Sequence, residues 1–312
     1  MTERTGRRRK HTVFALCLFV AALAGVYIFV GDRTIWGEWI SVGPPAVWVA
    51  LLLPSVVRLR SWILLAALAS FLVLACEWPR IPTSSATTSE TIRVLTWNMG
   101  AGNSSWAEAV KPWNPDIVLV QESTRPIAIE EGYHWYGTLD PGSLSRFAAE
   151  VLPTERIGPW MDPQLLLMKI HGRRVLVANV RMMLPSIVIQ LVDPLHERPM
   201  ENYRARVGQY GKLASLLEST ARSTGAEAIL LGGDFNIPAH MPSLAPFRHF
   251  LQDAWRASGS GWGATVPEFL PLVRIDQLWL SSEIQPLEVR VVRLEGSDHR
   301  AVIADISLPT VQ

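Results

Sequence analysis

The chain has 312 residues, of which 49% are hydrophobic and only 18% are charged, and its mean hydropathy is +0.19. An ordinary soluble domain carries about 25% charged residues. The composition therefore excludes a disordered chain, a collagen-like chain and a disulfide scaffold, and it disfavours a single purely soluble domain. The 29 basic and 28 acidic side chains nearly cancel, so the charge is informative only when the chain is divided.

Most of the excess hydrophobicity lies in three apolar stretches near the N-terminus, at residues 12–30, 39–57 and 61–76. Each is close to the ~20 residues that a helix needs to cross a bilayer. The second contains Gly43, Pro44 and Pro45, which membrane helices tolerate better than soluble helices do. We therefore predict a membrane anchor over residues 1–80 with three transmembrane helices. The alternative is a single anchor followed by two buried helices.

The first stretch also has features of a cleaved signal peptide. Basic residues precede it, and Ala-Leu-Ala at residues 22–24 resembles a cleavage site. The apolar run continues through Val30, however, which makes it longer than a usual signal core. We interpret it as a membrane helix.

Basic residues flank the stretches on one side: Arg4, Arg7, Arg8, Arg9 and Lys10 precede the first, and Arg58 and Arg60 lie between the second and third. The positive-inside rule then places the N-terminus in the cytoplasm. After three crossings, everything beyond Trp78 is expected outside the cytoplasm. A polar linker at residues 81–90 leads to the outer domain, residues 91–312.

The charge divides in the same way as the hydropathy. Residues 1–80 carry nine basic and four acidic side chains, and the remaining 232 residues carry 20 and 24. A nuclease that grips long DNA normally has a basic surface, so the acidic balance of the outer domain disfavours nucleic acid as a partner. Both cysteines, Cys17 and Cys76, lie in the predicted spans, so no disulfide is expected in the outer domain.

Short apolar strands alternate with helices in the outer domain. We predict strands at 91–97, 116–120, 174–180, 228–231, 274–280, 287–292 and 301–306, and helices at 104–111 and 202–221. This alternation indicates an α/β layered domain. The apolar connection at residues 183–200 is interpreted as an ordinary packed loop, with a substrate loop or a membrane contact as the alternative.

Several of these strands end or begin at polar residues that a buried strand would not choose: Asn98, Glu122, Asp234, Asn236, Asp276 and His299. Each alone has a structural explanation, such as a turn cap or an Asx turn. Glu122, a lone carboxylate at a strand end, suits a hard ion such as Mg²⁺.

Taken in order, the motifs resemble those of the endonuclease/exonuclease/phosphatase superfamily, the DNase I-like metal-dependent phosphoesterases. They are TWN at 96–98, QES at 121–123, SRF at 145–147, GGDFN at 232–236, TVP at 265–267, RID at 274–276 and SDH at 297–299. The resemblance covers roughly residues 91–308. It implies a DNase I-like four-layered α/β sandwich, here preceded by the three transmembrane helices.

The resemblance also implies a metal site. Glu122 would coordinate Mg²⁺, or Mn²⁺ in its place, with help from Asn98. Asp298 would complete the ligand set.

The same resemblance assigns the reacting groups. Asp234 would orient or deprotonate the attacking water, and Asn236 would hold a phosphoryl oxygen. His299 would contact the phosphate or act in proton transfer, and Asp276 would fix its ring, as carboxylate–imidazole pairs do.

One position departs from the family pattern. Many members have Asn-x-His at the end of the central strand, where this chain has Asn179, Val180 and Arg181. An arginine binds phosphate bidentately but does not exchange protons, so we expect Arg181 to bind substrate. Arg204 and Arg206 are further candidates for the phosphate end of the site, with a solvated helix face as the alternative.

The sequence thus predicts a membrane-anchored, outward-facing, metal-dependent phosphoesterase. Its substrate would be a phosphate ester or pyrophosphate of a phosphorylated small molecule, a membrane lipid or a lipid-linked cell-envelope intermediate. One alternative is an exported nuclease acting on nucleic acid. The other is a non-catalytic binding module that retains the fold, for which Arg181 is the only support.

Overall fold

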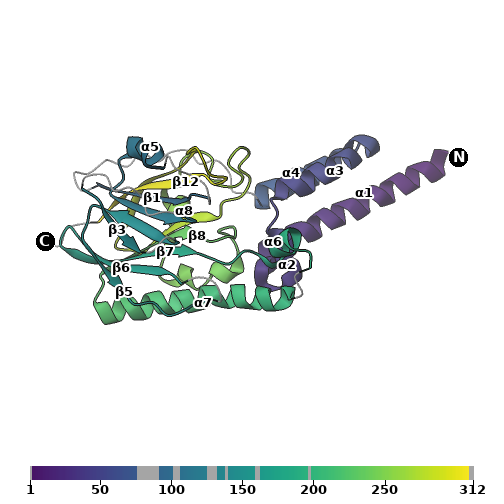
Figure 1. Cartoon of the computed structure of the whole chain (residues 1–312). Coiled ribbons are helices and arrows are strands. Elements are labelled where there is room, and N and C mark those ends of the chain that lie inside the picture. Colours follow the sequence, from purple (N-terminus) through teal and green to yellow (C-terminus); the bar gives the residue numbers. More distant parts are fainter. Residues whose placement is uncertain are drawn as a thin grey trace.

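The computed structural model describes residues 2–75, 91–100, 106–124, 132–137, 140–158, 162–195 and 198–308. A group of N-terminal helices projects from a layered α/β domain (Figure 1). The predicted linker at residues 81–90 lies outside the described residues, as do Cys76 and Trp78.

The N-terminal helices are α1 (Thr2–Gly25), α2 (Ile35–Ser41), α3 (Pro45–Leu59) and α4 (Trp62–Ala75), and the short turns η1 (Val26–Val30) and η2 (Gly31–Arg33) join α1 to α2. The continuous helical stretch from Arg7 to Arg33 has 27 residues, about 40 Å at 1.5 Å per residue. It is the one helix among the described residues that is long and apolar enough to cross a membrane by itself. A membrane anchor and a signal sequence both fit a helix of this length and composition.

The prediction of three full spans is wrong for the other two stretches. The second stretch is divided between α2 and α3, whose axes bend by 73°. Pro44 and Pro45 explain the break, because proline lacks the N–H that would continue the helical hydrogen bonds and clashes with the preceding turn. The third stretch forms α4, whose 14 described residues extend about 21 Å, short of the ~30 Å hydrocarbon core.

The domain contains two six-stranded mixed sheets. The first has the order β11-β12-β1-β2-β4-β3 and the second the order β5-β6-β7-β8-β10-β9. Their strands are β1 (Thr91–Asn98), β2 (Ile117–Gln121), β3 (His134–Gly137), β4 (Gly142–Ser145), β5 (Ala149–Leu152), β6 (Gln164–Ile170), β7 (Arg173–Arg181), β8 (Ala228–Asp234), β9 (Gln252–Asp253), β10 (Asp276–Leu280), β11 (Gln285–Val292) and β12 (Ala301–Ser307).

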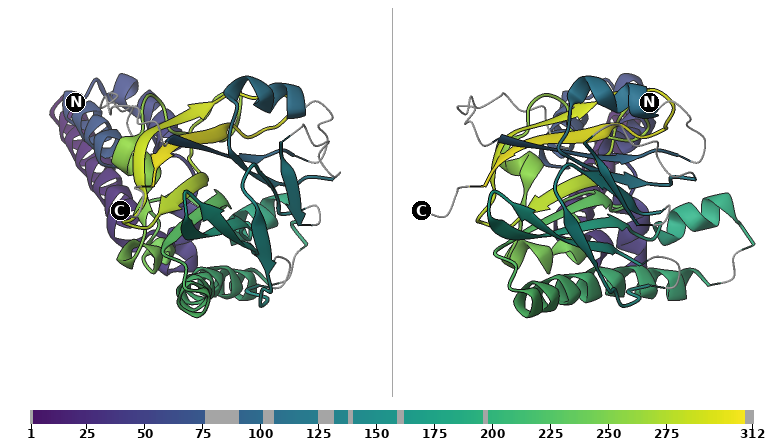
Figure 2. Two further views of the ribbon diagram at one scale, coloured as in Figure 1. Left: turned by 90° about the vertical axis from the view of Figure 1, so that its left-hand side faces the viewer. Right: turned by 60° about the vertical axis from the view of Figure 1, so that its left-hand side comes forward.

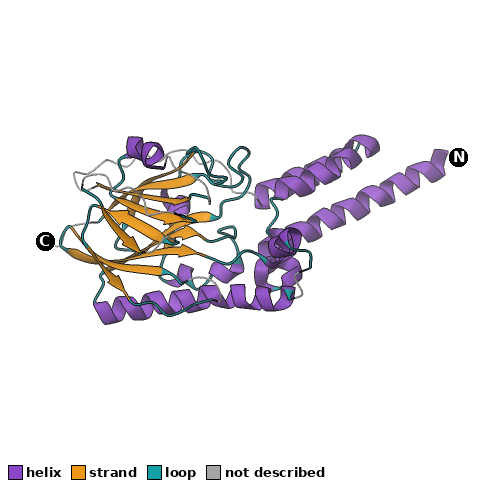
Figure 3. Cartoon of the chain, viewed as in Figure 1, coloured by secondary structure: helices purple, strands orange, loops and turns teal. Residues whose placement is uncertain are grey.

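Helices cover the outer faces of the two sheets: α5 (Trp106–Val110) with the 3-10 turn η3 (Lys111–Trp113) packs on the first sheet, and the long α7 (Pro199–Thr224) packs on the second (Figures 2 and 3). The short α8 (Ala254–Ser258) packs into the core between the sheets, and α6 (Ser186–Val192) packs against α7 and α2. Two further 3-10 turns are η4 (Pro242–Leu244) and η5 (Phe247–His249). The core between the sheets contains Val94 and Leu119 of the first sheet and Val177 of the second. A separate core joins the second sheet to α7. The order helix, sheet, sheet, helix is consistent with the expected DNase I-like sandwich.

The seven predicted strands and the long helix are present, with boundaries shifted by a few residues. Five strands were not predicted, namely β3, β4, β5, β6 and the two-residue β9, and residues 183–200, interpreted as a loop, contain α6. β3 to β5 have only four residues each, which is too short for a two-residue alternation to stand out.

Buried charges dock the N-terminal helices onto the domain. Arg206 on α7 donates to the carboxylates of Glu38 on α2, with Nε to Oε2 at 2.9 Å, and of Asp32, at 3.2 Å. All three residues have 0% exposure. Backbone N–H groups of the domain also donate to these two carboxylates: that of Ser186 donates to Glu38 (2.7 Å) and that of Ser243 donates to Asp32 (3.0 Å). The N-terminal segment therefore packs as part of one body with the domain.

Candidate functional site

The polar strand ends meet at one edge of the sandwich. β1 runs parallel to β2 in the first sheet, and β7 runs parallel to β8 in the second, so each pair ends at the same edge. Antiparallel pairing of β8 with β10 places Asp234 opposite Asp276. Asn98 joins the two sheets, because its amide Nδ2 lies 3.0 Å from Oε1 of Glu122 and 3.0 Å from Oδ2 of Asp234.

Two of these residues have left-handed backbone conformations. Glu122 has φ +56° and Asn236 has φ +55°, a region that costs a non-glycine residue about 1–3 kcal/mol and is enriched at functional sites. Hydrogen bonds hold both. The Glu122 N–H donates to Oδ1 of Asp140 (3.0 Å), and the Asn236 N–H donates to Oδ1 of Asp234 (2.9 Å).

The backbone at position 233, immediately before Asp234, requires a glycine. It has φ +144°, and a Cβ at this position would lie 1.9 Å from the carbonyl oxygen of Val180. Only glycine lets β8 and β7 approach so closely where both enter the site.

Asp234 is a buried carboxyl in the centre of the cluster. Burial and the nearby carboxylate of Asp276 raise the pKa of Asp234 from 3.8 to about 7, against the opposing effects of His299 and the hydrogen bonds from Asn236 and Asn98. Burial also disfavours the charged form of His299, but the carboxylate of Asp276 outweighs burial and raises the pKa of His299 to about 10. Asp234 and His299 therefore share one buried site, in which the charge of each acts on the pKa of the other.

The ring of His299 is held from several sides. Its Nδ1 lies 2.9 Å from Oδ2 and 3.2 Å from Oδ1 of Asp276, and its backbone N–H donates to the hydroxyl of Ser297 (3.0 Å). That hydroxyl donates to the carbonyl of Asn98 (2.6 Å). A carboxylate on Nδ1 fixes the ring orientation and directs Nε2 away from Asp276.

The residues present fit a divalent cation in their donor chemistry. Asn98 and Glu122, the predicted ligands, are in contact, and carboxylate and amide oxygens suit Mg²⁺ or Mn²⁺. The structure adds a second set that the sequence reading assigned only to catalysis: Asp234, Asp276 and His299 offer ligand atoms within 4.8 Å of one another.

Asp298, the third predicted ligand, is exposed at the rim of the cluster. A Cβ placed on Gly100, two residues after Asn98, would lie 3.5 Å from Oδ1 of Asp298. The Asp298 carboxylate is therefore near Asn98 and His299 but is not one of the buried carboxyls.

Arg181 lies at the site, where the family pattern has histidine. One guanidinium nitrogen is 2.5 Å from Oε1 of Glu122 and the other is 2.7 Å from Oδ2 of Asp140. Its side chain is 24% exposed, so part of the guanidinium faces solvent at the mouth. A fixed cation beside Glu122 suits the binding of a phosphate oxygen.

Arg206 does not lie at this site. The expectation that it contacts phosphate is wrong, because its guanidinium is fully buried against Glu38 and Asp32 of the N-terminal segment. Arg204, two residues earlier, is exposed on α7, as the solvated-face alternative expects.

Two supporting residues were missed by sequence reasoning. The carboxylate of Asp140 accepts hydrogen bonds from the guanidinium of Arg181 and from the backbone N–H of Glu122. It lies in a loop with no recognisable motif around it. Asn179 is buried beneath the site and accepts from Gln121 (2.6 Å) while donating to the carbonyl of Gly142 (2.8 Å). The Asn-x-His comparison pointed to Asn179, but only as a marker of the position of Arg181.

Comparison with known proteins identifies the class. Residues 95–299 match the model of the Endonuclease/Exonuclease/phosphatase family, and the chain therefore belongs to this family. Members of the family are phosphoesterases or nucleases, so the chain is a hydrolase by family. No curated protein matches the sequence.

Solved structures with the same fold include a mannosyl-6-phosphatase from Bacteroides thetaiotaomicron, with 16% sequence identity and a TM-score of 0.54. The matched region covers 69% of this chain and 99% of the phosphatase chain. Truncated TDP2 from Caenorhabditis elegans has 20% identity and a TM-score of 0.52, and covers 70% of this chain and 98% of that one. At these identities the likeness shows the fold alone.

Proposed function

We propose that the protein is a membrane-anchored, outward-facing, metal-dependent phosphoesterase that cleaves a phosphate ester or pyrophosphate of a lipid or lipid-linked envelope molecule. The observation that carries the proposal is the meeting of Asn98, Glu122, Asp234, Asp276 and His299 at one sheet edge, with Arg181 at its mouth. Phosphoryl transfer requires positioned charge and a positioned water more than covalent chemistry by the protein.

The residues divide the work by position. Asn98 and Glu122 would hold a divalent cation, which supplies charge neutralisation for the phosphoryl oxygens when bound. Asp234 accepts a hydrogen bond from the attacking water and takes its proton. The imidazole Nε2 of His299, with Nδ1 held by Asp276, contacts the phosphate and gives a proton to the leaving oxygen.

Arg181 and Asn236 serve the substrate. The guanidinium of Arg181 retains N–H groups beyond those bonded to Glu122 and Asp140, and these bind a phosphoryl oxygen. The side-chain amide of Asn236 donates to the carbonyl oxygen of Met182 (2.8 Å) and to Oδ2 of Asp234 (3.2 Å). Transfer of the longer of these two hydrogen bonds to the substrate would let Asn236 bind the same phosphoryl oxygen.

The proposed anchor is the helix Arg7–Arg33. Apolar side chains on it are exposed, among them Phe14 (65%) and Phe29 (69%), as expected of a surface that faces lipid. Arg9 donates to the carbonyl of Arg60 (3.0 Å), so the basic residues in the first turns of α1 and those near the junction of α3 and α4 gather at the end remote from the layered domain. The positive-inside rule then favours an outward-facing domain.

The proposed substrate class follows from location and charge. The catalytic edge is the one from which the chain leads through Met182 to Ser186 and its contact with Glu38, so the site lies on the side of the anchor. The acidic balance of the outer domain disfavours long nucleic acids. The mannosyl-6-phosphatase with the same fold is a phosphatase by name, which fits a phosphate ester.

The test uses the purified full chain in detergent with Mg²⁺ or Mn²⁺, offered phospholipids, lipid pyrophosphates and DNA in parallel. We expect hydrolysis of a lipid phosphate, abolished in His299→Gln. Fast DNA cleavage without lipid turnover would overturn the proposal. Labelling of an introduced Glu150→Cys with a membrane-impermeant maleimide on intact cells tests the orientation, since Glu150 is exposed on β5. Labelling only after lysis would contradict it.

A further inference from the structure

The large apolar side chains that the layered domain exposes are gathered in two segments. Among the described residues beyond residue 90, nine such side chains are exposed, of which five lie between residues 184 and 200 and three lie between residues 262 and 270. The ninth is Val151 on β5. Single exposed apolar residues are normal on a protein surface, but groups of them mark interaction sites. The first segment, called here the α6 segment, exposes Leu184, Leu191, Val192, Leu195 and Met200, and the second, the 262–270 loop, exposes Trp262, Phe269 and Leu270.

Both segments border the candidate site. The α6 segment leaves the site directly, because Leu184 comes three residues after Arg181, which lies at the mouth. The 262–270 loop reaches the site just before β12, where the backbone N–H of Glu268 donates to the carbonyl of Asp298 (2.8 Å). The two segments therefore meet the site on the β7 side and on the β12 side of its mouth.

The α6 segment lies against the end of the proposed anchor. The indole Nε1 of Trp39 on α2 donates to the hydroxyl of Ser186 at the start of α6 (3.0 Å). The ring of Trp39 packs edge-on against that of Trp36, with centroids 4.9 Å apart, and Trp36 is 67% exposed. α2 begins two residues after Arg33, where the long apolar helix ends. The α6 segment is therefore next to the point at which a membrane-spanning helix would emerge from the bilayer.

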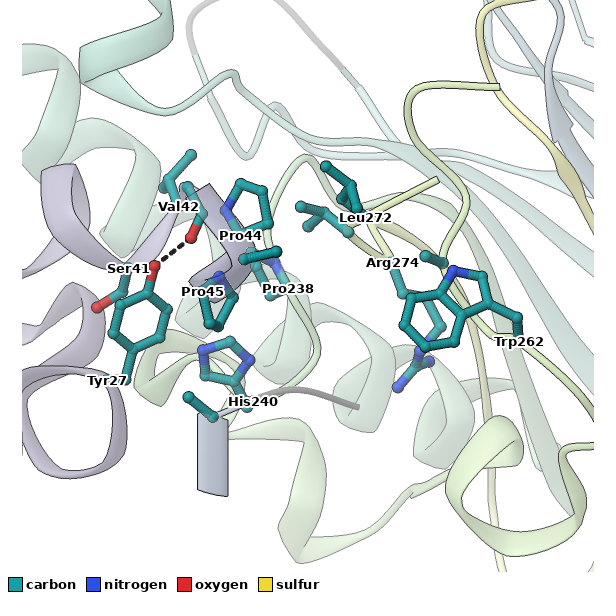
Figure 4. Close-up of a pocket in the computed structure, with 15 residues that line it drawn as sticks. Tyr27, Ser41, Val42, Pro44, Pro45, Pro238, His240, Trp262, Leu272 and Arg274 are labelled. Carbon is teal, nitrogen blue, oxygen red and sulfur yellow. Dashed lines mark hydrogen bonds between the residues drawn. The ribbon is translucent and has the colours of Figure 1, made fainter. Parts of the chain in front are cut away.

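The 262–270 loop lies against the same group of helices. Trp262 and Leu272 line one small cavity together with Pro44 and Pro45 at the start of α3 (Figure 4). Ala75, at the end of α4, lines that cavity as well. Both exposed apolar segments are therefore at the end of the layered domain from which the N-terminal helices project (Figure 1).

The surface of a lipid bilayer fits these two segments better than a second copy of the chain does. The sequence from Met182 to Val192 contains no charged residue, and an exposed tryptophan such as Trp36 is typical of the membrane–water interface. A second copy seated on both segments would cover the mouth between them and exclude substrate. A bilayer in the same place presents lipid headgroups to the mouth.

We propose that the α6 segment and the 262–270 loop insert their exposed apolar side chains into the bilayer surface beside the anchor and hold the mouth of the site against lipid headgroups. This inference rests on the proposed function, since it names the surface through which a lipid substrate reaches the site. Side chains inserted in this way lie about 5–10 Å deep, at the boundary between headgroups and acyl chains. The anchor then fixes the domain in one orientation, with its catalytic edge toward the membrane.

The test measures the depth of single labelled positions in lipid nanodiscs. The full chain carries Cys17→Ala and Cys76→Ala, and either Leu191→Cys or Phe269→Cys is labelled with the environment-sensitive fluorophore NBD. The discs contain phosphatidylcholine and phosphatidylglycerol, with or without a nitroxide on the fifth carbon of an acyl chain. We expect the nitroxide to quench both labels at least about twofold, because it lies at the depth that interfacial side chains reach.

The control is a label on Arg174→Cys. Arg174 is exposed at the other end of β7, seven residues before Arg181 and about 23 Å away along the strand, so its label should not be quenched. If the labels at Leu191 and Phe269 are quenched no more than the label at Arg174, the inference is wrong. An emission shift that depends on protein concentration in detergent, without quenching in discs, would show that a second copy covers these segments and would also overturn it. A full chain that does not enter the discs contradicts the anchor and this inference together.

The readout separates the two proposals because quenching does not require turnover. Quenching at Leu191 and Phe269 with no phosphoester hydrolysed keeps the membrane-contacting surface and rejects the phosphoesterase. Hydrolysis of a lipid phosphate with no quenching above that at Arg174 keeps the function and rejects the membrane-contacting surface.

Discussion

Nε of Arg206, on α7 of the layered domain, lies 2.9 Å from Oε2 of Glu38, on α2 of the N-terminal segment, and both side chains are fully buried. Asp32 shares the same guanidinium. Removing one partner of a buried ion pair leaves uncompensated charge and typically costs about 3–5 kcal/mol. We therefore expect Arg206→Leu to lower the unfolding temperature of the purified full chain markedly, as followed by tryptophan fluorescence.

Arg204→Leu is the control for this change, since Arg204 is exposed on the same helix two residues earlier. Its effect on stability should stay within about 0.5 kcal/mol. Equal melting temperatures for the natural chain, Arg204→Leu and Arg206→Leu would contradict the docking of the N-terminal segment through Arg206.

Glu122→Ala should weaken divalent metal binding. Glu122 contacts Asn98, and removal of a carboxylate ligand from a hard-metal site is expected to lower Mn²⁺ affinity by at least about tenfold. Titration calorimetry of the full chain with Mn²⁺ measures this. Glu150→Ala, which removes an exposed carboxylate from β5, should leave the affinity unchanged. If Glu122→Ala binds Mn²⁺ as the natural chain does, the metal is held elsewhere, with Asp234, Asp276 and His299 as the next ligand set to test.

Sequence reasoning located the site well where the information is local. Asn98, Glu122 and Asp234 each follow or end a buried apolar run, and parallel strands bring their carboxyl ends to one edge. A polar residue at such an end is therefore placed by the topology alone. The ordered motifs fixed the family, and with it the layered fold, from short segments that are individually uninformative.

The predictions that were wrong or missing concern features that depend on contacts between distant segments or on helical continuity. The periodicity of α7 indicates that one face is buried, but not that Asp32 and Glu38, more than 160 residues earlier, cover Arg206. Asp140 has no signal in its own loop, since its role comes from the position of Arg181. Hydropathy counted three apolar stretches, but it measures composition and not helical continuity, which Pro44 and Pro45 interrupt.

Arg181→Ala should impair substrate handling more than folding. The guanidinium bridges Glu122 and Asp140 and faces solvent at the mouth, so its loss removes a charged phosphate contact and frees Glu122. We expect kcat/KM to fall by about 100-fold, the usual size for loss of one charge-stabilising donor. Arg181→Lys should recover little, because an ammonium group does not bridge two carboxylates in the way a planar guanidinium does.

Arg174→Ala, at the other end of β7 and exposed, is the control for Arg181. Steady-state kinetics on the lipid phosphate identified in the substrate test measures all three variants. Full activity in Arg181→Ala would show that the arginine at the usual histidine position has no part in substrate binding.

Asp276→Asn tests how His299 is held. The carboxylate lies 2.9 Å from Nδ1 and fixes which ring nitrogen carries the proton, whereas an amide accepts less strongly and leaves Nε2 in the wrong state for part of the population. We expect kcat to fall by about 10²–10⁴-fold, the range for a disturbed general acid or base. The ¹⁵N spectrum of His299 should change at the same time, which a purely structural role for Asp276 does not require.

Asp305→Asn is the control for Asp276→Asn, because it removes another buried carboxylate. Asp305 is paired with Arg93 at 2.6 Å near the start of β1, about 17 Å along the strand from Asn98. This variant should lose stability while keeping both kcat and the His299 signal, so an equal loss of kcat in the two variants would show that the effect of Asp276 is one of folding.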